Sequence, residues 1–331
     1  MSAALPEAVP AATAPSRLAP LRRHALPLLM LAVLVILPLA VPGFFTGVAT
    51  RGMAYGLAAA ALGFLIPHGG MISLGHAAYL GAGAYAVLLC RMAGLHEALL
   101  VWPIAAAAGG VLALLLGALS LRTRGVYFIM ITLSFAQMLY IIFSSLQVLG
   151  SVDGIGLPAR NTLAGVPLDG TILFHYVVLA ILAAGLLLLG ILSRSAFGLA
   201  LRGVRDNERR MRAAGYRTTR LMLAAFTLSG ALSGLAGALV ANFYLFVSPA
   251  FLHWLLSGEL LVMVILGGLG GVAGPVLGAF ALIVAETALS EWTTYWRVIL
   301  GPAVILVVLF LPQGLSGWRR RGETGGSSGH G

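Results

Sequence analysis

Long apolar stretches recur along almost the whole chain, and short polar or glycine-rich segments separate them. A helix needs about 20 apolar residues to cross the hydrocarbon core of a membrane, and most of these stretches approach that length. Ten of them cover residues 26–42, 48–66, 72–90, 98–119, 126–148, 172–192, 221–246, 255–267, 272–290 and 296–311. The stretch 255–267 is too short for an upright span and is interpreted as a half-helix or a broken helix. The pattern predicts an all-α polytopic membrane protein with about ten transmembrane helices, within a range of eight to ten.

The composition supports this class of protein and limits the possible energy sources for transport. Of the 331 residues, 60% are hydrophobic and 9% are charged, all 20 cationic residues are Arg, and Lys does not occur. A phosphate-binding loop and a Schiff base both need Lys, so the chain carries neither. Energy for transport would therefore come from an ion gradient or from another polypeptide. The single Cys90 lies in an apolar run and is expected to be a buried small hydrophobe.

The arginines predict an orientation, because short cytoplasmic loops of membrane proteins carry the excess of positive charge. With ten spans and a cytoplasmic N-terminus, 16 of the 20 arginines fall on the cytoplasmic side. The four that fall outside are Arg51, Arg91, Arg160 and Arg297. Both termini are therefore expected in the cytoplasm.

Three regions are expected along the chain. Residues 1–24 are rich in Ala and Pro and end in a basic cluster, which predicts a disordered basic tail. A cleaved signal peptide is the alternative, but prolines replace its small-residue cleavage site and further spans follow. Residues 25–315 would form the transmembrane permease domain, and the Gly/Ser-rich residues 316–331 a second disordered tail.

The segment 194–220 is the most informative, because eight arginines fall within its 27 residues, between two apolar runs. Its apolar positions share one helical face, and Gly215 is expected to end the helix. These positions are Leu201, Val204, Met211 and Ala214. One interpretation is a basic helix resting on anionic headgroups. The other is a docking helix for a cytoplasmic partner, which the interspersed Asp206 and Glu208 favour.

Segment 194–238 combines a Phe-Gly pair, an Arg-rich helix with an acidic-Asn-acidic triplet, a Gly and a small-residue span. These residues are Phe197, Gly198, Arg202, Arg205, Asp206, Asn207, Glu208, Gly215, Ala225, Phe226, Ser229 and 234–238. With them the segment resembles the cytoplasmic coupling region of permease subunits of bacterial branched-chain amino acid ABC importers, the LivM-type family. Segments 73–85, 121–135 and 267–279 resemble the same family in the same order, so the resemblance covers about residues 45–315. One departure is Arg212, which stands where many ABC permeases have the Glu of a Glu-Ala-Ala-x-x-x-Gly signature.

The resemblance implies a type II ABC importer-like permease that is not itself an enzyme and passes branched-chain or related amino acids across the bacterial inner membrane. Its implied partners are a companion permease subunit, two cytoplasmic ATP-binding subunits, a periplasmic solute-binding protein and membrane lipid, without nucleic acid. The ATP-binding subunits would hold ATP and Mg²⁺, so no cofactor is expected in this chain. Segment 202–215 would insert into a groove of an ATP-binding subunit. Its expected coupling residues are Arg202, Arg205, Asp206, Asn207, Glu208 and Gly215.

Polar residues within the apolar stretches are the candidates for a translocation pathway. Glycines around Ser73 and His76 interrupt helices, and irregular backbone at membrane depth is tolerated where it faces protein or water. Tight helix packing, with His76 hydrogen-bonded to a neighbouring carbonyl, is the structural alternative. An isolated Gln137 would be costly in hydrocarbon. The pathway candidates are Ser73, His76, Tyr127, Thr132, Gln137 and Glu259.

Two other functions fit the same pattern. A stand-alone secondary transporter or channel would use Glu259 or Glu286 as its coupling acid, since an intramembrane acid is a functional candidate. An ABC permease of the same architecture would carry urea, amides or aromatic acids. No His, Asp or Glu spacing suits a metal site, and no nucleophile motif supports a membrane enzyme.

Overall fold

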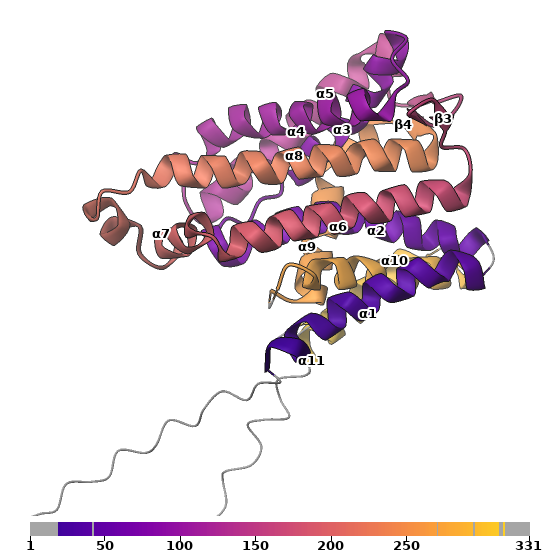
Figure 1. Cartoon of the computed structure of the whole chain (residues 1–331). Coiled ribbons are helices and arrows are strands. Elements are labelled where there is room, and N and C mark those ends of the chain that lie inside the picture. The colour runs from indigo at the N-terminus through magenta and orange to yellow at the C-terminus, as the bar shows by residue number, and fades with distance from the viewer. Residues whose placement is uncertain (1–18, 42, 270, 294, 311–313, 315–331) are drawn as a thin grey trace, which may run out of the picture.

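The computed structural model describes residues 19–41, 43–269, 271–293, 295–310 and 314, which form a bundle of helices (Figure 1). Each predicted apolar stretch forms a helix, because backbone in hydrocarbon must satisfy its polar groups internally. The helices are α1 (Ala19–Ala40), α2 (Gly43–Gly69), α3 (His76–Met92), α4 (Ala98–Ser120), α5 (Val126–Ser145), α6 (Thr171–Arg194), α7 (Ala196–Ala213), α8 (Thr218–Tyr244), α9 (Trp254–Gly267), α10 (Gly274–Trp292) and α11 (Trp296–Phe310).

Within the described residues, six helices are long and apolar enough to cross a membrane: α2, α4, α5, α6, α8 and α10. The short α9 fits the half-helix expected from its sequence. The finer estimate of about ten spans stays a prediction. Because α1 begins at Ala19, residues 19–24 of the expected N-terminal tail are helical. The rest of that tail and the expected tail at 316–331 lie outside the described residues.

Helix α8 lies at the centre of the bundle and packs against α2, α3 and α4 (Figure 1). Glycines allow these backbones to approach closely, as is common where helices associate in membranes. A Cβ added at Gly83 of α3 would collide with the carbonyl oxygen of Gly234 of α8. A Cβ at Gly109 of α4 would lie 2.8 Å from the Cα of the same Gly234. Gly234 is therefore the point where three helices meet.

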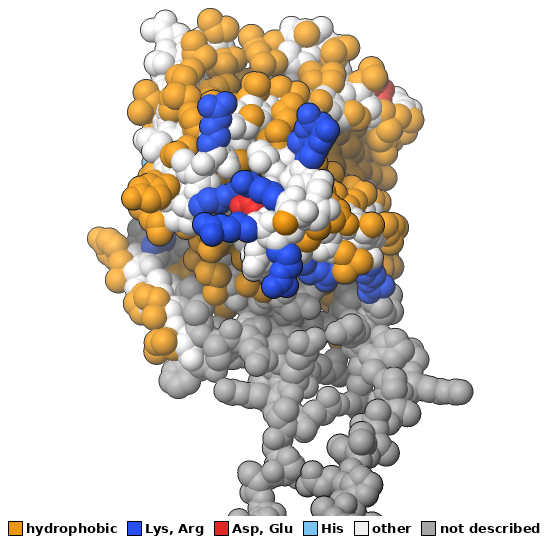
Figure 2. Space-filling model, turned by 90° about the vertical axis from the view of Figure 1, so that its left-hand side faces the viewer, with side chains coloured by type: hydrophobic (Ala, Val, Ile, Leu, Met, Phe, Trp, Pro, Cys, Tyr) orange, Lys and Arg blue, Asp and Glu red, His pale blue; other side chains and the backbone are white. Residues whose placement is uncertain are grey.

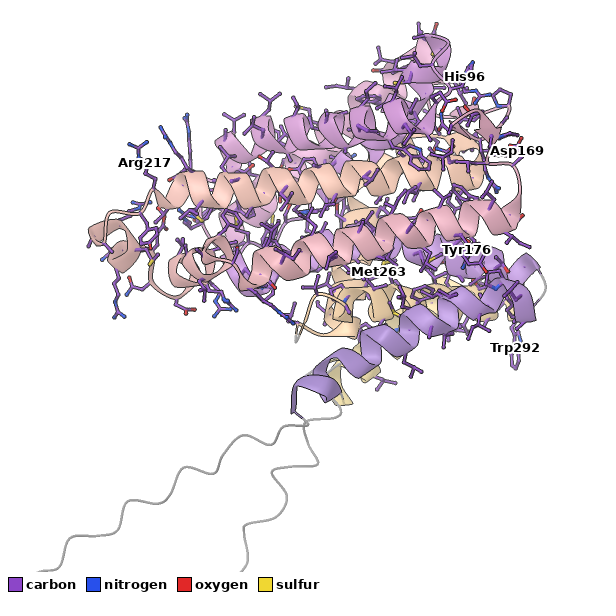
Figure 3. The ribbon with its side chains drawn as sticks, in the orientation of Figure 1. His96, Asp169, Tyr176, Arg217, Met263 and Trp292 are labelled. Atoms are coloured by element: carbon purple, nitrogen blue, oxygen red, sulfur yellow. The ribbon has the colours of Figure 1, made fainter. Side chains whose placement is uncertain are left out.

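The bundle has two chemically different ends. Arg217 lies at the end that carries α7, called here the α7 end, and His96 and Asp169 lie at the opposite end (Figure 3). Seen from the α7 end, arginine side chains gather around an acidic group (Figure 2). The arginines of segment 194–220 therefore share one end of the molecule, as their sequence clustering predicts.

The opposite end, called here the strand end, holds the strands and two 3₁₀ turns of the described chain. Strand β1 (Ile155–Gly156) pairs antiparallel with β4 (Phe246–Val247), and β2 (Thr162–Leu163) pairs with β3 (Val166–Pro167). The 3₁₀ turns are η1 (Gln147–Leu149) and η2 (Pro249–Leu252). Arg160 fastens this layer, because its Nε donates to the Asn242 carbonyl oxygen at 3.1 Å. The sequence patterns did not predict these strands.

The predicted span 72–90 begins later than expected. Helix α2 continues to Gly69, residues 70–75 are not helical, and α3 begins at His76. Gly70 has a φ of +64°, a backbone conformation that favours glycine. Met71, Ser73 and Gly75 are buried, whereas Gly70 and Ile72 are exposed, so the segment 70–75 is only partly enclosed by protein. The helix interruption predicted from the glycines is present, and it lies between α2 and α3.

Candidate functional site

Helix α7 has well-defined ends. Ser195 caps its start, with Oγ accepting from the Gly198 N–H at 3.5 Å. At the other end, Gly215 adopts a φ of +89° and the Tyr216 N–H reaches the Met211 carbonyl oxygen at 3.0 Å. A left-handed glycine with this hydrogen bond is a common way to end a helix. The structure confirms Gly215 as the stop signal.

The prediction that four apolar residues share one continuous helical face is wrong. Asn207 has φ −159° and ψ 94°, so the helix is broken there into two halves. Leu201 and Val204 of the first half are buried, whereas Ala214 is exposed. Met211 of the second half folds back, and its Sδ would lie 2.8 Å from a Cβ at Gly203. The break changes the direction of the second half relative to the first.

The first half of α7 is anchored to α6 and α2. Arg202 Nη2 donates to the Ser193 carbonyl oxygen at 3.0 Å, and Arg205 Nη1 donates to the Pro67 carbonyl oxygen. Arg205 also pairs with Asp206, whose side chain remains 64% exposed. Arg202 and Arg205 thus hold α7 in place, while Asp206 faces outward.

The second half of α7 is organised around Glu208. One of its oxygens, Oε1, accepts from Arg124 Nη2 at 2.7 Å, Arg212 Nη2 at 2.7 Å and Thr218 Oγ1 at 2.9 Å. Arg124 precedes α5, and its Nη1 also contacts Met222 Sδ of α8 at 3.1 Å. Asn207 Oδ1 accepts from the Arg210 N–H at 3.0 Å and so caps this half. Glu208 therefore joins α7, α8 and the turn between α4 and α5.

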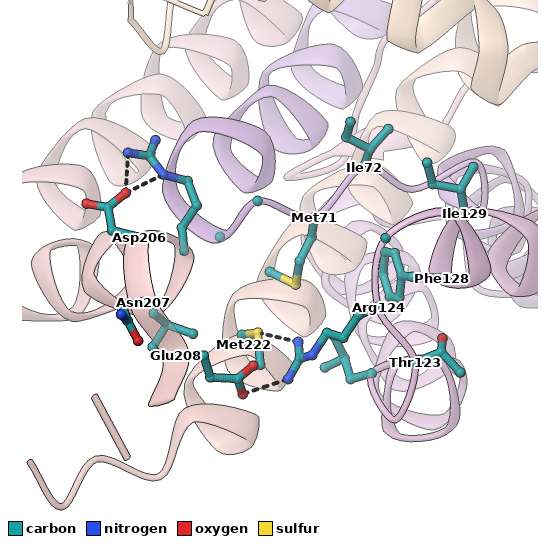
Figure 4. A pocket seen from close by; sticks show the side chains of 16 residues that line it. Met71, Ile72, Thr123, Arg124, Phe128, Ile129, Asp206, Asn207, Glu208 and Met222 are labelled. Atoms are coloured by element: carbon teal, nitrogen blue, oxygen red, sulfur yellow. Dashed lines mark hydrogen bonds and ion pairs between the residues drawn. The ribbon is translucent and has the colours of Figure 1, made fainter. Parts of the chain in front are cut away.

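A pocket of about 300 Å³ separates α7 from the start of α5 and from the segment after α2 (Figure 4). Its floor is apolar, with Met71, Phe128 and Met222 among the lining side chains. Glu208 turns toward Arg124 at one side of the pocket, whereas Asp206 pairs at the other side (Figure 4). Both acids line this pocket on different sides, and their assignment to one docking surface stays a prediction.

Three pathway candidates come together where α3 begins. His76 Nε2 lies 2.9 Å from Ser229 Oγ, which itself donates to the Ala61 carbonyl oxygen at 2.8 Å. The imidazole therefore donates from Nε2, and its buried Nδ1 has no hydrogen-bond partner among the described residues. The expected partner of His76 was a carbonyl group, and the structure supplies a hydroxyl.

Thr132 and Ser73 lie beside this histidine. Thr132 Oγ1 of α5 accepts from the Leu74 N–H at 3.2 Å, and Ser73 Oγ accepts from the Gly75 N–H at 3.1 Å. Ser257 of α9, which the sequence did not single out, accepts from the Ala77 N–H at 2.8 Å. Hydroxyl groups from α5 and α9 therefore fasten the non-helical segment and the first turn of α3.

Tyr127 and Gln137 lie on an open face of α5. Only 17% of the most apolar stretch of α5 is buried within the chain, and the Tyr127 side chain is highly exposed. Gln137 lines a shallow pocket with Ser134 and Met138, and its Oε1 atom is buried without a hydrogen-bond partner in the described chain. Tyr127 is therefore exposed, whereas Gln137 is partly buried at this face, with its Oε1 atom enclosed.

Glu259 lies apart from the other candidates. It is about 200° around α9 from Ser257, because it lies two positions further along the helix. Arg51, Glu286 and Arg297 are near enough to interact with it electrostatically. Glu286 itself accepts two hydrogen bonds from Arg51, at 2.7 and 2.8 Å. Among the described residues, no three His, Cys, Asp or Glu side chains are grouped as a metal site requires.

Six long apolar helices among the described residues, with an Arg-rich, broken helix at one end, define a multi-pass membrane protein. The chain belongs to the family described as branched-chain amino acid transport system / permease component, whose model matches residues 44–309.

The chain is similar to the curated permease proteins of this family. It is 28% identical to the high-affinity branched-chain amino acid transport system permease protein LivM of Salmonella typhimurium, over 86% of this chain and 73% of the relative. The match to LivM of Escherichia coli is also 28%, over 87% of this chain and 74% of the relative. A shorter match, 29% identical over 37% of this chain and 40% of the relative, is to LivH of Salmonella typhimurium. No solved structure matches the chain.

Proposed function

We propose that this chain is the permease subunit of an ATP-driven importer that moves branched-chain or related amino acids across the bacterial inner membrane. The observation that carries the proposal is α7, an anchored polar helix outside an apolar bundle in a chain of the permease family. The relatives in that family are branched-chain amino acid permeases by name. The solute class is inferred from them, and urea, amides or aromatic acids are the alternative cargo.

Helix α7 is proposed to dock into an ATP-binding subunit. Its first half is held to α2 and α6 by Arg202 and Arg205, so force applied to α7 would reach the bundle. Its outward surface includes the exposed Asp206, Arg209 and Arg210. Mixed charges of this kind suit a protein partner better than an anionic lipid surface. ATP and Mg²⁺ would be bound by that partner, and no cofactor is assigned to this chain.

The α7 end is proposed to face the cytoplasm, with both chain termini on that side. Support comes from the arginines of the α7 end, because positive charge accumulates in cytoplasmic loops. The strand end would then face the periplasm, where a solute-binding protein delivers the amino acid. Its ordered strands and the Arg160 contacts would give that protein a rigid surface.

A companion permease is proposed to cover the open face of α5. A polar side chain without a partner is costly in hydrocarbon, and polar residues promote helix association in membranes. Gln137 meets this description, because its Oε1 has no partner within the described chain. The solute path would run between the two permeases, with Tyr127 and Gln137 beside it and Ser73, His76 and Thr132 behind. Glu259 stays a pathway candidate at the strand end.

A secondary transporter is less well supported. Glu286, one of its two candidate coupling acids, is held in a two-bond pair with Arg51, and both side chains are about three-quarters buried. Removing the charge from one member of such a pair leaves the other uncompensated. Glu286 is therefore better explained as a structural link between α2 and α10.

The docking role is tested by co-purification. Asp206→Arg combined with Arg209→Glu reverses two outward charges, and we expect loss of the ATP-binding subunits and of ATP-dependent uptake. Asp153→Arg is the control for recovery of the ATP-binding subunits, because Asp153 is an exposed acid far from α7. Uptake is not its readout, since it lies at the strand end that is proposed to face the solute-binding protein. Full retention of the ATP-binding subunits by the α7 double variant would overturn the docking assignment.

A further inference from the structure

The two halves of α7 are attached to different parts of the bundle. The half before Asn207 contacts α2 through the Arg205 bond to the Pro67 carbonyl oxygen. The half after Asn207 contacts α8 and the α4–α5 turn through Glu208. Because Asn207 is not helical, the two halves can shift relative to each other more easily than one continuous helix could. A displacement of α7 thus has two separate routes into the bundle.

Glu208 is poorly placed to contact a docked partner. Its side chain is 24% exposed, against 64% for Asp206. A single oxygen, Oε1, accepts from three donors on three structural elements, as described above. The carboxylate is therefore turned toward the bundle, and its charge is neutralised there by Arg124 and Arg212.

The route through Glu208 leads to α5. Arg124 is followed by Gly125, which has a φ of +60° and precedes the first residue of α5. Two turns further on, Thr132 Oγ1 accepts from the Leu74 N–H, beside the start of α3. The pocket lies between α7 and the start of α5. Among the described residues, the ion pair between Arg124 and Glu208 connects the two sides of this pocket. Movement of α5 would in turn reach the face that carries Gln137.

We propose that Glu208 transmits the movement of α7 to α5, as a positioning residue that acts through Arg124 and has no direct role in docking. This inference rests on the proposed function, in which α7 follows the ATP-binding subunits. The Arg124–Glu208 ion pair connects α7 to α5 across the pocket. In this proposal, α5 moves with α7 only while the ion pair is intact. Asp206, Arg209 and Arg210 remain the docking surface.

The test uses the assembled complex in proteoliposomes, with the solute-binding protein supplied on its own side. Glu208→Gln and Arg124→Gln remove one charge each and keep hydrogen-bonding groups. Arg122→Gln is the matched control, because Arg122 is an exposed arginine of the same turn. For each variant, three quantities are measured: recovery of the ATP-binding subunits, basal ATPase rate, and stimulation of that rate by loaded binding protein.

We expect both pair variants to assemble and to keep the basal ATPase rate. Stimulation by the binding protein should fall about fivefold or more, since couplings between sites are commonly of that size or larger. The exchanged pair, Arg124→Glu with Glu208→Arg, should recover part of the stimulation, whereas Arg122→Gln should change nothing. Loss of assembly in Glu208→Gln would mean that Glu208 docks, and unchanged stimulation would mean that it transmits nothing.

A local probe separates transmission from general stability. Cys90 is the only cysteine, so Cys90→Ala allows one label to be placed at Met130→Cys, on the face of α5 that is exposed in this chain. Because the companion permease is proposed to cover that face, unchanged recovery of the companion is the control for this variant. With the intact pair, we expect the spectrum of a spin label there to change when ATP is added. With Glu208→Gln it should not change, and an unchanged ATP response would contradict the proposal. If the wild-type complex itself failed to assemble or to respond to binding protein, the proposed function would fail instead.

Discussion

His175 holds α1 to the bundle by capturing the carbonyl oxygen of Leu34. His175 Nε2 lies 2.9 Å from that oxygen, which can only accept, so the imidazole is the donor. In a regular helix this oxygen would accept from the N–H of residue 38, but residue 38 is Pro and has no N–H. The oxygen is therefore available to His175. His175 Nδ1 lies 2.9 Å from Thr50 Oγ1 of α2. One buried side chain of α6 thus connects α1 with α2.

Replacing this histidine should loosen α1. His175→Phe leaves the Leu34 carbonyl without a donor, and we expect a loss of about 0.5–2 kcal/mol of stability, the range of hydrogen bonds between membrane helices. Pro38→Ala restores an N–H at that position, so the loss from His175→Phe should be smaller in its presence. Thermal unfolding of the detergent-purified chain measures both. Equal losses in the two backgrounds would contradict the link.

The contact between α3 and α8 requires glycine. Gly83→Ala places a methyl group against the Gly234 carbonyl oxygen, and we expect destabilisation of about 1–3 kcal/mol from overpacking. Gly190→Ala in α6 is the control, because a Cβ there has open space around it. If Gly83→Ala lowers the unfolding midpoint no more than Gly190→Ala does, the backbones of α3 and α8 are further apart than the structure shows.

Local sequence pattern was sufficient to predict the helices and several of their ends. The apolar stretches mark the bundle, Gly215 marks the end of α7, and the glycines near Ser73 mark the interruption before α3. Each of these features depends on residues that are close together in the chain. Charge counting also separates the α7 end from the strand end, because the arginines of segment 194–220 are neighbours in sequence.

Contacts between distant segments were beyond the same reasoning. Arg124 and Glu208 are 84 residues apart, and neither residue type alone indicates the other. The break at Asn207 was missed because the apolar spacing on both sides fits one continuous helix. The bond from His175 to Leu34 and the strand pairing of β1 with β4 are likewise set by tertiary packing. Tertiary packing likewise decides that Ser73, His76 and Thr132 are buried together, whereas Tyr127 and Gln137 lie on the open face of α5.

The left-handed conformation of Gly215 should matter for the second half of α7. Gly215→Ala has space for its Cβ but strains the backbone, with an expected cost of about 1 kcal/mol. Gly215→Asn should cost less, because Asn tolerates this conformation. Proteolysis of the 208–217 region in the assembled complex measures the loosening. Indistinguishable cleavage rates for Ala, Asn and Gly would contradict the assignment.

Gln137 should matter for pairing with a companion permease. Gln137→Leu removes the polar group from the open face of α5, and we expect the recovered companion to fall about threefold or more, as loss of about 0.6 kcal/mol or more predicts. Met138→Leu is the control, because it changes an exposed apolar residue next to it. Unchanged recovery of the companion in Gln137→Leu would contradict the pairing and place this face against lipid instead.

The central claim is that ATP hydrolysis by partner subunits drives solute movement through this chain. Uptake of a radiolabelled branched-chain amino acid into proteoliposomes, with ion gradients collapsed by ionophores, tests it most directly. The account predicts uptake only when ATP, the ATP-binding subunits, the companion permease and the loaded binding protein are all present. Uptake by this chain alone, driven by an ion gradient without ATP, would contradict it.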